Sequence, residues 1–275
     1  MAKPIKTLVQ KNVKPRKPES LFRKTFNSIF TKPKMFLYVI LLDLAFFVIF
    51  FLLNLLANYL MPKDPTFISR VQSDTMLMIF FVLVIIAYFV IMLLIYSFFS
   101  LVILGNIKSL SVKHDFDFSL FKNMFFLNLL LFVFFFLLVV ILNLALGFLI
   151  NKSIWIGIIV GIVLLIILFM AYAFYNFTHS SFILGHELKY VIKKSLKHVF
   201  SNVYLETFLF SFGVIAVYII LYFLAGLFFK DFIMNNYNAF VNISSIIILV
   251  IVYILFAINR VYFFFIAEKH IGHKK

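Results

Sequence analysis

The stretch MFLYVILLDLAFFVIFFLLNLL, Met35–Leu56, decides the class of fold. A helix of this length rises about 33 Å and so crosses the roughly 30 Å hydrocarbon layer of a bilayer. One carboxylate, Asp43, lies inside the stretch. A charge at such depth costs about 2.5–3.5 kcal/mol on insertion scales and usually has a partner facing it. We therefore expect a membrane-spanning helix whose carboxylate is paired with another part of the chain.

The composition of the whole chain excludes a soluble fold. Of its 275 residues, 65% are hydrophobic and only 13% are charged, whereas soluble domains are about half apolar and a quarter charged. The polar residues are too few to cover a water-facing exterior, so the chain is predicted to be a polytopic membrane protein. It contains no Cys, which excludes disulfides, a thiolate nucleophile and Cys-ligated metals.

Apolar runs long enough to span a bilayer occur six times. The expected spans are about Met35–Leu60, Thr75–Leu104, Met124–Ile150, Ile154–Leu184, Phe208–Phe229 and Ile243–Ala267. We predict one all-α domain over residues 20–268, a polytopic bundle of six transmembrane helices, with a basic flexible tail at 1–19 and a basic C-terminal tail at 269–275.

The distribution of Lys and Arg predicts the orientation. Of the 25 such residues, 20 lie before span 1, between spans 2 and 3, between spans 4 and 5, or after span 6. By the positive-inside rule, both termini are expected in the cytoplasm. The protein is therefore expected to be a multi-pass protein of the cell membrane. The bias toward Phe, Ile, Lys and Asn favours a prokaryotic source.

The basic tail also indicates partners. Basic residues near a membrane surface attract anionic lipid headgroups by about 1 kcal/mol each. A ribosome or nucleic-acid contact is the alternative use of such a tail. We expect no nucleic-acid partner, because any membrane protein with a cytoplasmic N-terminus carries this charge.

Short cytoplasmic segments suggest an internal repeat. SLFRKTF at Ser20, SLFKNMF at Ser119 and SLKHVFS at Ser195 begin alike and place apolar residues at helical spacing opposite lysines. Such helices lie in the membrane interface, and we call them elbow helices. The predicted unit is an elbow helix, a span, a short turn and a span, repeated at about 20–105, 119–185 and 195–268. Coincidence in a sequence of low complexity is the alternative.

The ends of the proposed repeat units are also similar to one another in sequence. SLVILG at Ser100–Gly105 and SSFILG at Ser180–Gly185 end the first two units, and FFFIAE at Phe263–Glu268 is a weaker third copy. Duplicated hairpins are a common way to build membrane proteins.

The segment that follows span 4 combines small, acidic and basic residues. ILGHELKYVIKKSLKH, which follows span 4, combines Gly185 and Glu187 with a basic helix carrying Lys194, Ser195 and Lys197. With the six-span layout, these residues resemble the six-helix prokaryotic integral membrane domains of unknown function, including the membrane domain fused to some glycerophosphodiester phosphodiesterases. The resemblance implies a membrane domain with a cytoplasmic elbow after span 4. It covers no part of the phosphodiesterase and therefore implies no catalytic residue.

Polar residues inside the spans form the candidate site. Asp43 lies eight residues beyond Met35, and Arg260 lies nine residues before Lys269, so both reach about 12 Å from the same side. We predict that they pair and join spans 1 and 6. The same level holds further polar residues, namely Asn176, His179, Asn259, Ser97 and Ser100.

Two interpretations of this polar cluster stay open, and a third concerns one residue. The cluster either pins helices that hydrophobicity cannot hold together in lipid, or lines a cytoplasm-facing cavity for an anionic headgroup, a peptide segment or a solute. Arg260 could also extend unpaired to the interface.

A small-residue pattern in span 4 predicts helix packing. Gly157 and Gly161 in GIIVG are spaced so that another helix can approach closely, with Ala145 and Gly147 of span 3 as the expected contact.

Motifs for catalysis are missing from the sequence. There is no HExxH, Gly-rich phosphate loop, GxSxG or acidic metal cluster, so we expect no catalytic residue, no metal and no cofactor. His270 and His273 could share a metal with His186 or His198, but no carboxylate completes such a site. The favoured function is a non-enzymatic membrane module acting on lipids or partner proteins from the cytoplasmic face. The alternative is a small-solute transporter or permease component, followed by an enzyme acting on lipid headgroups.

Overall fold

The computed structural model describes residues 20–60, 65–111, 117–149, 154–199 and 203–272, and these are organised almost entirely in helices. Six helices are long and apolar enough to cross a membrane, which confirms the all-α polytopic class. They are α2 (Pro33–Leu60), α4 (Thr75–Ser111), α5 (Phe121–Leu149), α6 (Ile154–Ile183), α8 (Val203–Phe228) and α10 (Tyr237–Ile271). The basic tail 1–19 and residues 273–275, with His273, lie outside the described part of the chain.

The observed helices are longer than the predicted spans at several ends. The largest difference is in α4, which was predicted to end at Leu104 and ends at Ser111. Its last residues include Asn106 and Lys108. Hydropathy detects only the part of a helix that lies in hydrocarbon, whereas backbone hydrogen bonding continues the helix into the polar interface.

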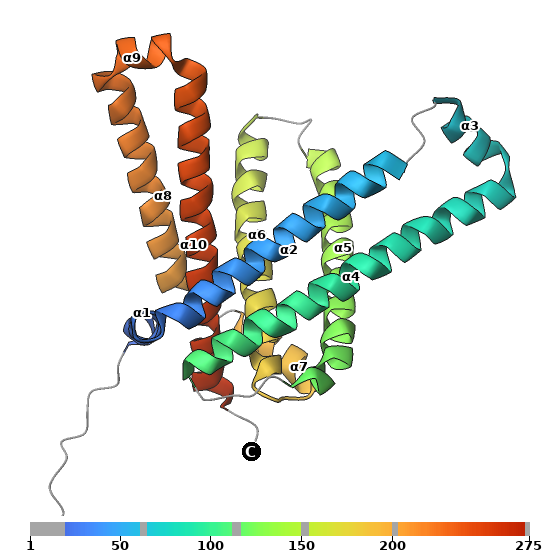
Figure 1. The fold of residues 1–275 in the computed structure, drawn as a ribbon, viewed down its shortest axis with the longest axis horizontal. Helices are drawn as coiled ribbons and strands as arrows, with labels where there is room; N and C mark the ends of the chain where they lie inside the picture. Colours follow the sequence, from blue (N-terminus) through green and yellow to red (C-terminus); the bar gives the residue numbers. More distant parts are fainter. Residues whose placement is uncertain (1–19, 61–64, 112–116, 150–153, 200–202, 273–275) are drawn as a thin grey trace, which may run out of the picture.

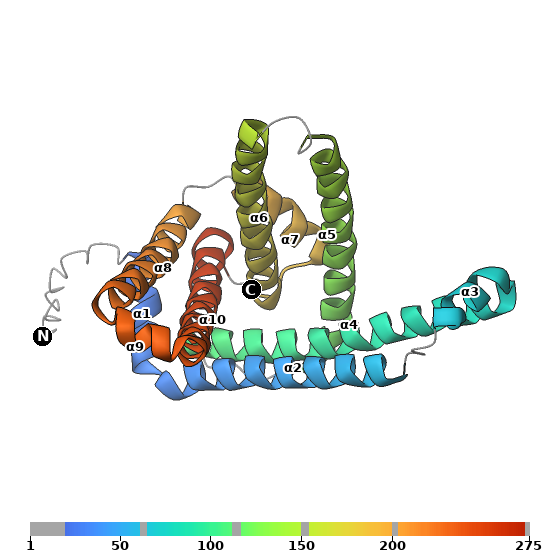
Figure 2. The same cartoon turned by 90° about the horizontal axis from the view of Figure 1, so that it is seen from above.

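Consecutive spans pair as three hairpins, α2–α4, α5–α6 and α8–α10 (Figure 1). Short helices α3 (Pro65–Ser73) and α9 (Lys230–Asn235) cap the far ends of the first and third hairpins. Viewed from above, α2 and α4 form a layer of their own along one side of the other spans (Figure 2). The first helix and the end of α10 lie at the same end of the bundle. We call this end the base (residues 20–43, 97–111, 117–131, 173–199 and 255–272) and the end with α3 and α9 the tips.

Two of the three predicted elbow helices are separate helices at the base. The first is α1 (Leu21–Thr31), which begins where Ser20 Oγ accepts a hydrogen bond from the Arg23 amide at 3.3 Å. The second is α7 (Leu188–His198), which buries Val191 and Ser195.

The middle elbow helix is a wrong prediction. Residues Phe118–Leu120 form one 3₁₀ turn that leads directly into α5. The difference has a local cause: Pro33, which has no amide hydrogen, starts a new helix after α1. Residues 118–125 contain no Pro or Gly, and the 3₁₀ turn passes into α5 at Phe121.

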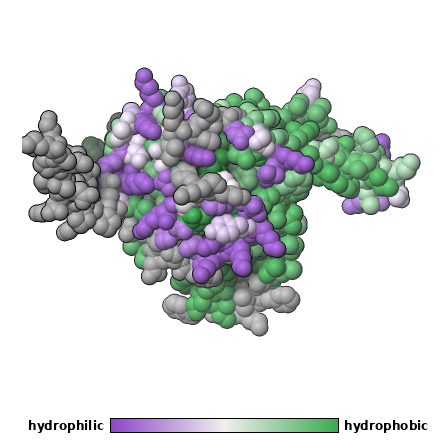
Figure 3. Space-filling view, turned by 90° about the horizontal axis from the view of Figure 1, so that it is seen from below, coloured by the Kyte–Doolittle hydropathy of each residue, from purple (hydrophilic) through white to green (hydrophobic). Residues whose placement is uncertain are grey.

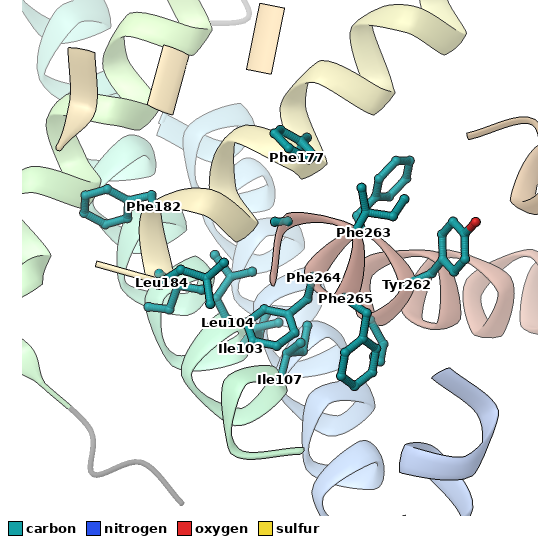
Figure 4. Close-up of a cluster of buried hydrophobic side chains, with 14 of the residues drawn as sticks. Ile103, Leu104, Ile107, Phe177, Phe182, Leu184, Tyr262, Phe263, Phe264 and Phe265 are labelled. Atoms are coloured by element: carbon teal, nitrogen blue, oxygen red, sulfur yellow. The ribbon is translucent and has the colours of Figure 1, made fainter. Parts of the chain in front are cut away.

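The hydrophobic core lies at the base (Figure 4). It contains the three segments that echo one another in the sequence: Leu101–Leu104 of α4, Phe182–Leu184 at the end of α6 and Phe263–Ala267 of α10. These segments therefore take corresponding places in the three hairpins, where α4, α6 and α10 contact one another. Their ends differ, since Gly185 ends α6 with a φ of 97°, which favours glycine, whereas α4 continues through Gly105 to Ser111.

Side chains from other parts of the chain bind the ends of α4, α6 and α10 at the base, and two of them, Lys108 and His186, do so between hairpins. Lys32 Nζ donates to the Ser109 carbonyl at 2.7 Å, and Lys108 Nζ donates to the Ile183 carbonyl at 3.0 Å. His186 Nε2 donates to the Gly272 carbonyl at 2.8 Å. The last carbonyls of a helix lack intrahelical partners and carry the negative end of the helix dipole, which cations stabilise. The second span of each hairpin, α4, α6 or α10, therefore ends with a carbonyl that accepts a hydrogen bond from a side chain elsewhere in the chain.

Toward the tips the hairpins diverge (Figure 1). In the most apolar window of each span, between 0% and 17% of the residues are buried. A Cβ added at Gly157 or Gly161 would meet no atom within 4 Å, and the same holds at Gly147. The predicted close packing at Gly157 and Gly161 is therefore wrong within this chain, because α6 has no neighbouring backbone near these glycines.

Candidate functional site

The centre of the candidate site is an ion pair between hairpins. Arg260 Nη1 of α10 donates to both carboxylate oxygens of Asp43 on α2, at 2.7 and 2.6 Å. The side chains are 27% and 10% exposed, respectively. The pair that the sequence predicts from depth is therefore formed, and it joins the first hairpin to the third.

A cavity of about 230 Å³ lies beside this pair, between α2, α4, α6 and α10. Five of the seven polar residues predicted for the cluster line it, namely Asp43, Ser100, Asn176, His179 and Arg260. The cavity lies where the packed base gives way to the diverging spans. The cluster thus joins two hairpins through an ion pair and also borders a cavity, while the predicted opening of that cavity to the cytoplasm stays a prediction.

Ser97 does not line the cavity but is connected through hydrogen bonds to His179, which does. Asn128 Nδ2 of α5 donates to Ser97 Oγ of α4 at 2.9 Å. The Asn128 Oδ1 lies 2.7 Å from Nε2 of His179 on α6, whose Nδ1 lies 3.0 Å from the Tyr175 carbonyl. Three spans from two hairpins are thus connected through one amide. Sequence reasoning missed Asn128, although a lone amide in the apolar run FFLNLLLF is the signal that could have found it.

Asn259 lies at the edge of the cluster, outside the cavity lining, and shares the neighbour Tyr172 with Asn176. Its Nδ2 donates to Ser211 Oγ of α8 at 3.2 Å, within the third hairpin. The neighbouring residue on a helix points about 100° away, so Asn259 and Arg260 face different helices.

Aromatic side chains form half of the cavity lining, and sequence reasoning did not single them out. Phe46 and Tyr96 meet edge to face at 5.6 Å, and Phe47 and Tyr253 do so at 6.1 Å. Tyr253 also donates to the Ile40 carbonyl of α2 at 3.0 Å. Among 41 Phe and 13 Tyr, no sequence signal selects those that share a cavity. The lining aromatics are Phe46, Phe47, Phe99, Phe256, Tyr96, Tyr175 and Tyr253.

The histidines at the base do not form a metal site in the described part of the chain, where no three His, Asp or Glu side chains come together to hold an ion. His198 and His270 lie with ring centroids 5.2 Å apart, and His186 is bound to the Gly272 carbonyl. Burial, with the nearby charges of His270, Lys194 and Lys197, lowers the pKa of the His198 imidazole below its usual value.

Comparisons of the chain with protein-family models, with curated proteins and with solved structures found no match. The fold defines the class, a polytopic all-α membrane protein with six apolar helices. The resemblance to the six-helix prokaryotic domains stays a prediction.

Proposed function

We propose that the protein is a non-enzymatic membrane module of the cell membrane whose base lies in the cytoplasm and binds anionic lipid headgroups or partner proteins. The observation that carries the proposal is the form of α7. This helix buries Val191 and Ser195 against the bundle and exposes Lys189, Lys193 and Lys197. A short amphipathic helix with lysines on its outer face suits a position at the level of anionic headgroups.

The surroundings of α7 support this proposal. Seen from below, hydrophilic residues gather on the base and the sides of the molecule are hydrophobic (Figure 3). Lys and Arg are enriched in the connections at this end, which by the positive-inside rule favours a cytoplasmic base and cytoplasmic termini.

Lipid binding by lysine variants tests the proposal. Replacing Lys189, Lys193 and Lys197 together by Gln removes three exposed charges, each worth about 1 kcal/mol near an anionic surface. We expect the affinity of the purified protein for phosphatidylglycerol, measured by native mass spectrometry, to fall at least about tenfold. Lys230→Gln, an exposed lysine on α9 at the tips, is the control and should change little. Equal affinities of the wild type and the triple variant would contradict the proposal.

A small-solute transporter is the alternative function, and the cavity is the observation that favours it. Against it, no charged side chain lies in the tip half of any described span. A path for an ion or a charged solute usually needs such residues. Stabilisation of the protein by a water-soluble compound, with none by lipids, would support the transporter.

A further inference from the structure

Arg260 lines the cavity, and its ion pair with Asp43 uses one of the three guanidinium nitrogens. A guanidinium has five N–H donors, and Arg260 directs the two of Nη1 to Asp43. Among the described residues, Nε and Nη2 have no hydrogen-bond partner. These two nitrogens form the planar edge that binds two oxygens of a phosphate or carboxylate at once. The cavity therefore offers a site for a group with two acceptor oxygens.

The charge of the lining restricts what such a ligand carries. Asp43 and Arg260 are the residues with a formal charge among those that line the cavity, and together they are neutral. In a low-dielectric environment an additional uncompensated charge is costly. A ligand that places an anionic group on Arg260 therefore needs a cationic group of its own, and the ligand as a whole is a zwitterion.

The aromatic rings beside Asp43 suit that cationic group. Phe47 lies one helical turn beyond Asp43 on the same face of α2, and its ring meets Tyr253. An ammonium ion is stabilised by a carboxylate and by the faces of aromatic rings. The cavity thus has an anion-binding edge and a cation-binding side within one small volume.

The exposed side of the cavity, which we call its mouth, lies on apolar spans, so we expect it to face lipid. Two of its lining residues, Phe47 and Phe256, are 55% and 47% exposed on spans that diverge toward the tips. A volume of about 230 Å³ can hold a small polar head and not a whole lipid. The remaining chains of an amphiphile can leave through the mouth into the bilayer.

We propose that the cavity binds the head of a zwitterionic phospholipid, with the phosphate on Nε and Nη2 of Arg260 and the ammonium group between Asp43 and the rings of Phe47 and Tyr253. This site is separate from α7 and has the opposite preference among lipids. It goes beyond the proposed function and does not depend on it.

Native mass spectrometry of the full chain in a neutral detergent tests the phosphate site. The probes are phosphatidylethanolamine and phosphatidylglycerol. Arg260→Lys keeps a positive charge opposite Asp43 and removes the second guanidinium edge. We expect it to lower the affinity for phosphatidylethanolamine at least about tenfold and to leave that for phosphatidylglycerol unchanged. Unchanged phosphatidylethanolamine binding in a folded variant, or an equal loss for both lipids, would overturn the proposal.

A matched pair of variants on α2 tests the ammonium site. It also tests the proposal if the Arg260→Lys variant does not fold. Phe47→Leu removes a ring at the mouth, whereas Phe51→Leu removes an equally exposed ring, 61%, that does not line the cavity. We expect a loss of about threefold for Phe47→Leu and none for Phe51→Leu. Equal affinities of the two variants would count against the proposal.

Two further measurements identify the source of the head and separate the two proposals. Displacement of phosphatidylethanolamine by soluble phosphoethanolamine would assign the site to a water-soluble zwitterion, and its failure would assign it to the lipid. The triple α7 lysine variant should bind phosphatidylethanolamine as the wild type does. Loss of phosphatidylethanolamine binding in that variant would contradict a site separate from α7. If the same variant binds phosphatidylglycerol as tightly as the wild type, the proposal for α7 fails and the proposal for the cavity is unaffected.

Discussion

The base and the tips of this molecule differ in what their polar contacts connect. At the base, Arg260–Asp43 and Lys108–Ile183 join different hairpins. Toward the tips, Tyr88 donates to Asn54 at 3.2 Å and Tyr218 donates to the Ser244 carbonyl at 2.6 Å, each within one hairpin. The hairpins stay together where contacts cross between them and diverge where they do not.

This difference shows what holds helices together in lipid. Hydrocarbon tails are as apolar as Phe or Leu, so removing apolar side chains from lipid gains little, and association depends on close packing and polar contacts. Both are concentrated at the base, where Phe264 and Phe265 are fully buried. The spans as a whole are long enough to cross the bilayer, but their apolar tip halves contain little that would draw one hairpin to another.

The ion pair should give the largest stability effect. Asp43→Asn leaves Arg260 charged and unpaired inside the bundle, and we expect a loss of about 2.5–3.5 kcal/mol in the free energy of unfolding in detergent. Combining Asp43→Arg with Arg260→Asp should restore part of the free energy of unfolding that each single substitution loses. Asn54→Leu, on the same helix near the tips, should cost about 0.6 kcal/mol or less. Purely additive losses in the charge swap would show that the pair does not join the hairpins.

An amide pair on α5 gives a smaller and closely matched comparison. Asn128→Leu removes the link between Ser97 and His179, and we expect a loss of about 1 kcal/mol by the same unfolding measurement. Asn143 donates to the Val139 carbonyl of its own helix and is exposed near the tips. Asn143→Leu should therefore change stability little. Similar losses at both positions would remove the distinction between base and tips.

The smallest effect concerns pH and a histidine at the base. The His198 pKa is lowered from 6.5, chiefly by burial, so the unfolded chain binds a proton more readily than the folded one. Stability should then fall as the pH drops below about 6.5 and should not depend on His198 at higher pH. Thermal unfolding of His198→Gln between about pH 8 and pH 5.5 should show a flatter profile than the wild type. Parallel profiles would assign the acid sensitivity to other groups.

The sequence predicts the spans and the ion pair because both follow from depth in the bilayer. Charges are so costly in hydrocarbon that a lone Asp43 and a lone Arg260 at matching depth have few other arrangements. Hydropathy likewise identifies six spans because each must exceed the thickness of the bilayer. Both arguments use depth along a helix and need no knowledge of which faces meet.

The sequence does not predict the divergence of the hairpins or the aromatic lining. The spans are apolar on all sides, so no apolar stripe marks the face of α2 or α6 that packs. For the same reason the pattern at Gly157 and Gly161 could not show that no helix lies against it. The lone amide of Asn128 in an apolar run marks it as a candidate, but other spans carry such amides too, and its partners Ser97 and His179 are seen only in the structure.

The divergence of the hairpins also changes how much lipid the protein displaces in each leaflet. At the base the spans occupy a compact area, whereas at the tips acyl chains must fill the space between three separate hairpins. In a bilayer, lipid would therefore contact the inner faces of the hairpins at the tips, whereas at the base the packed helices exclude it.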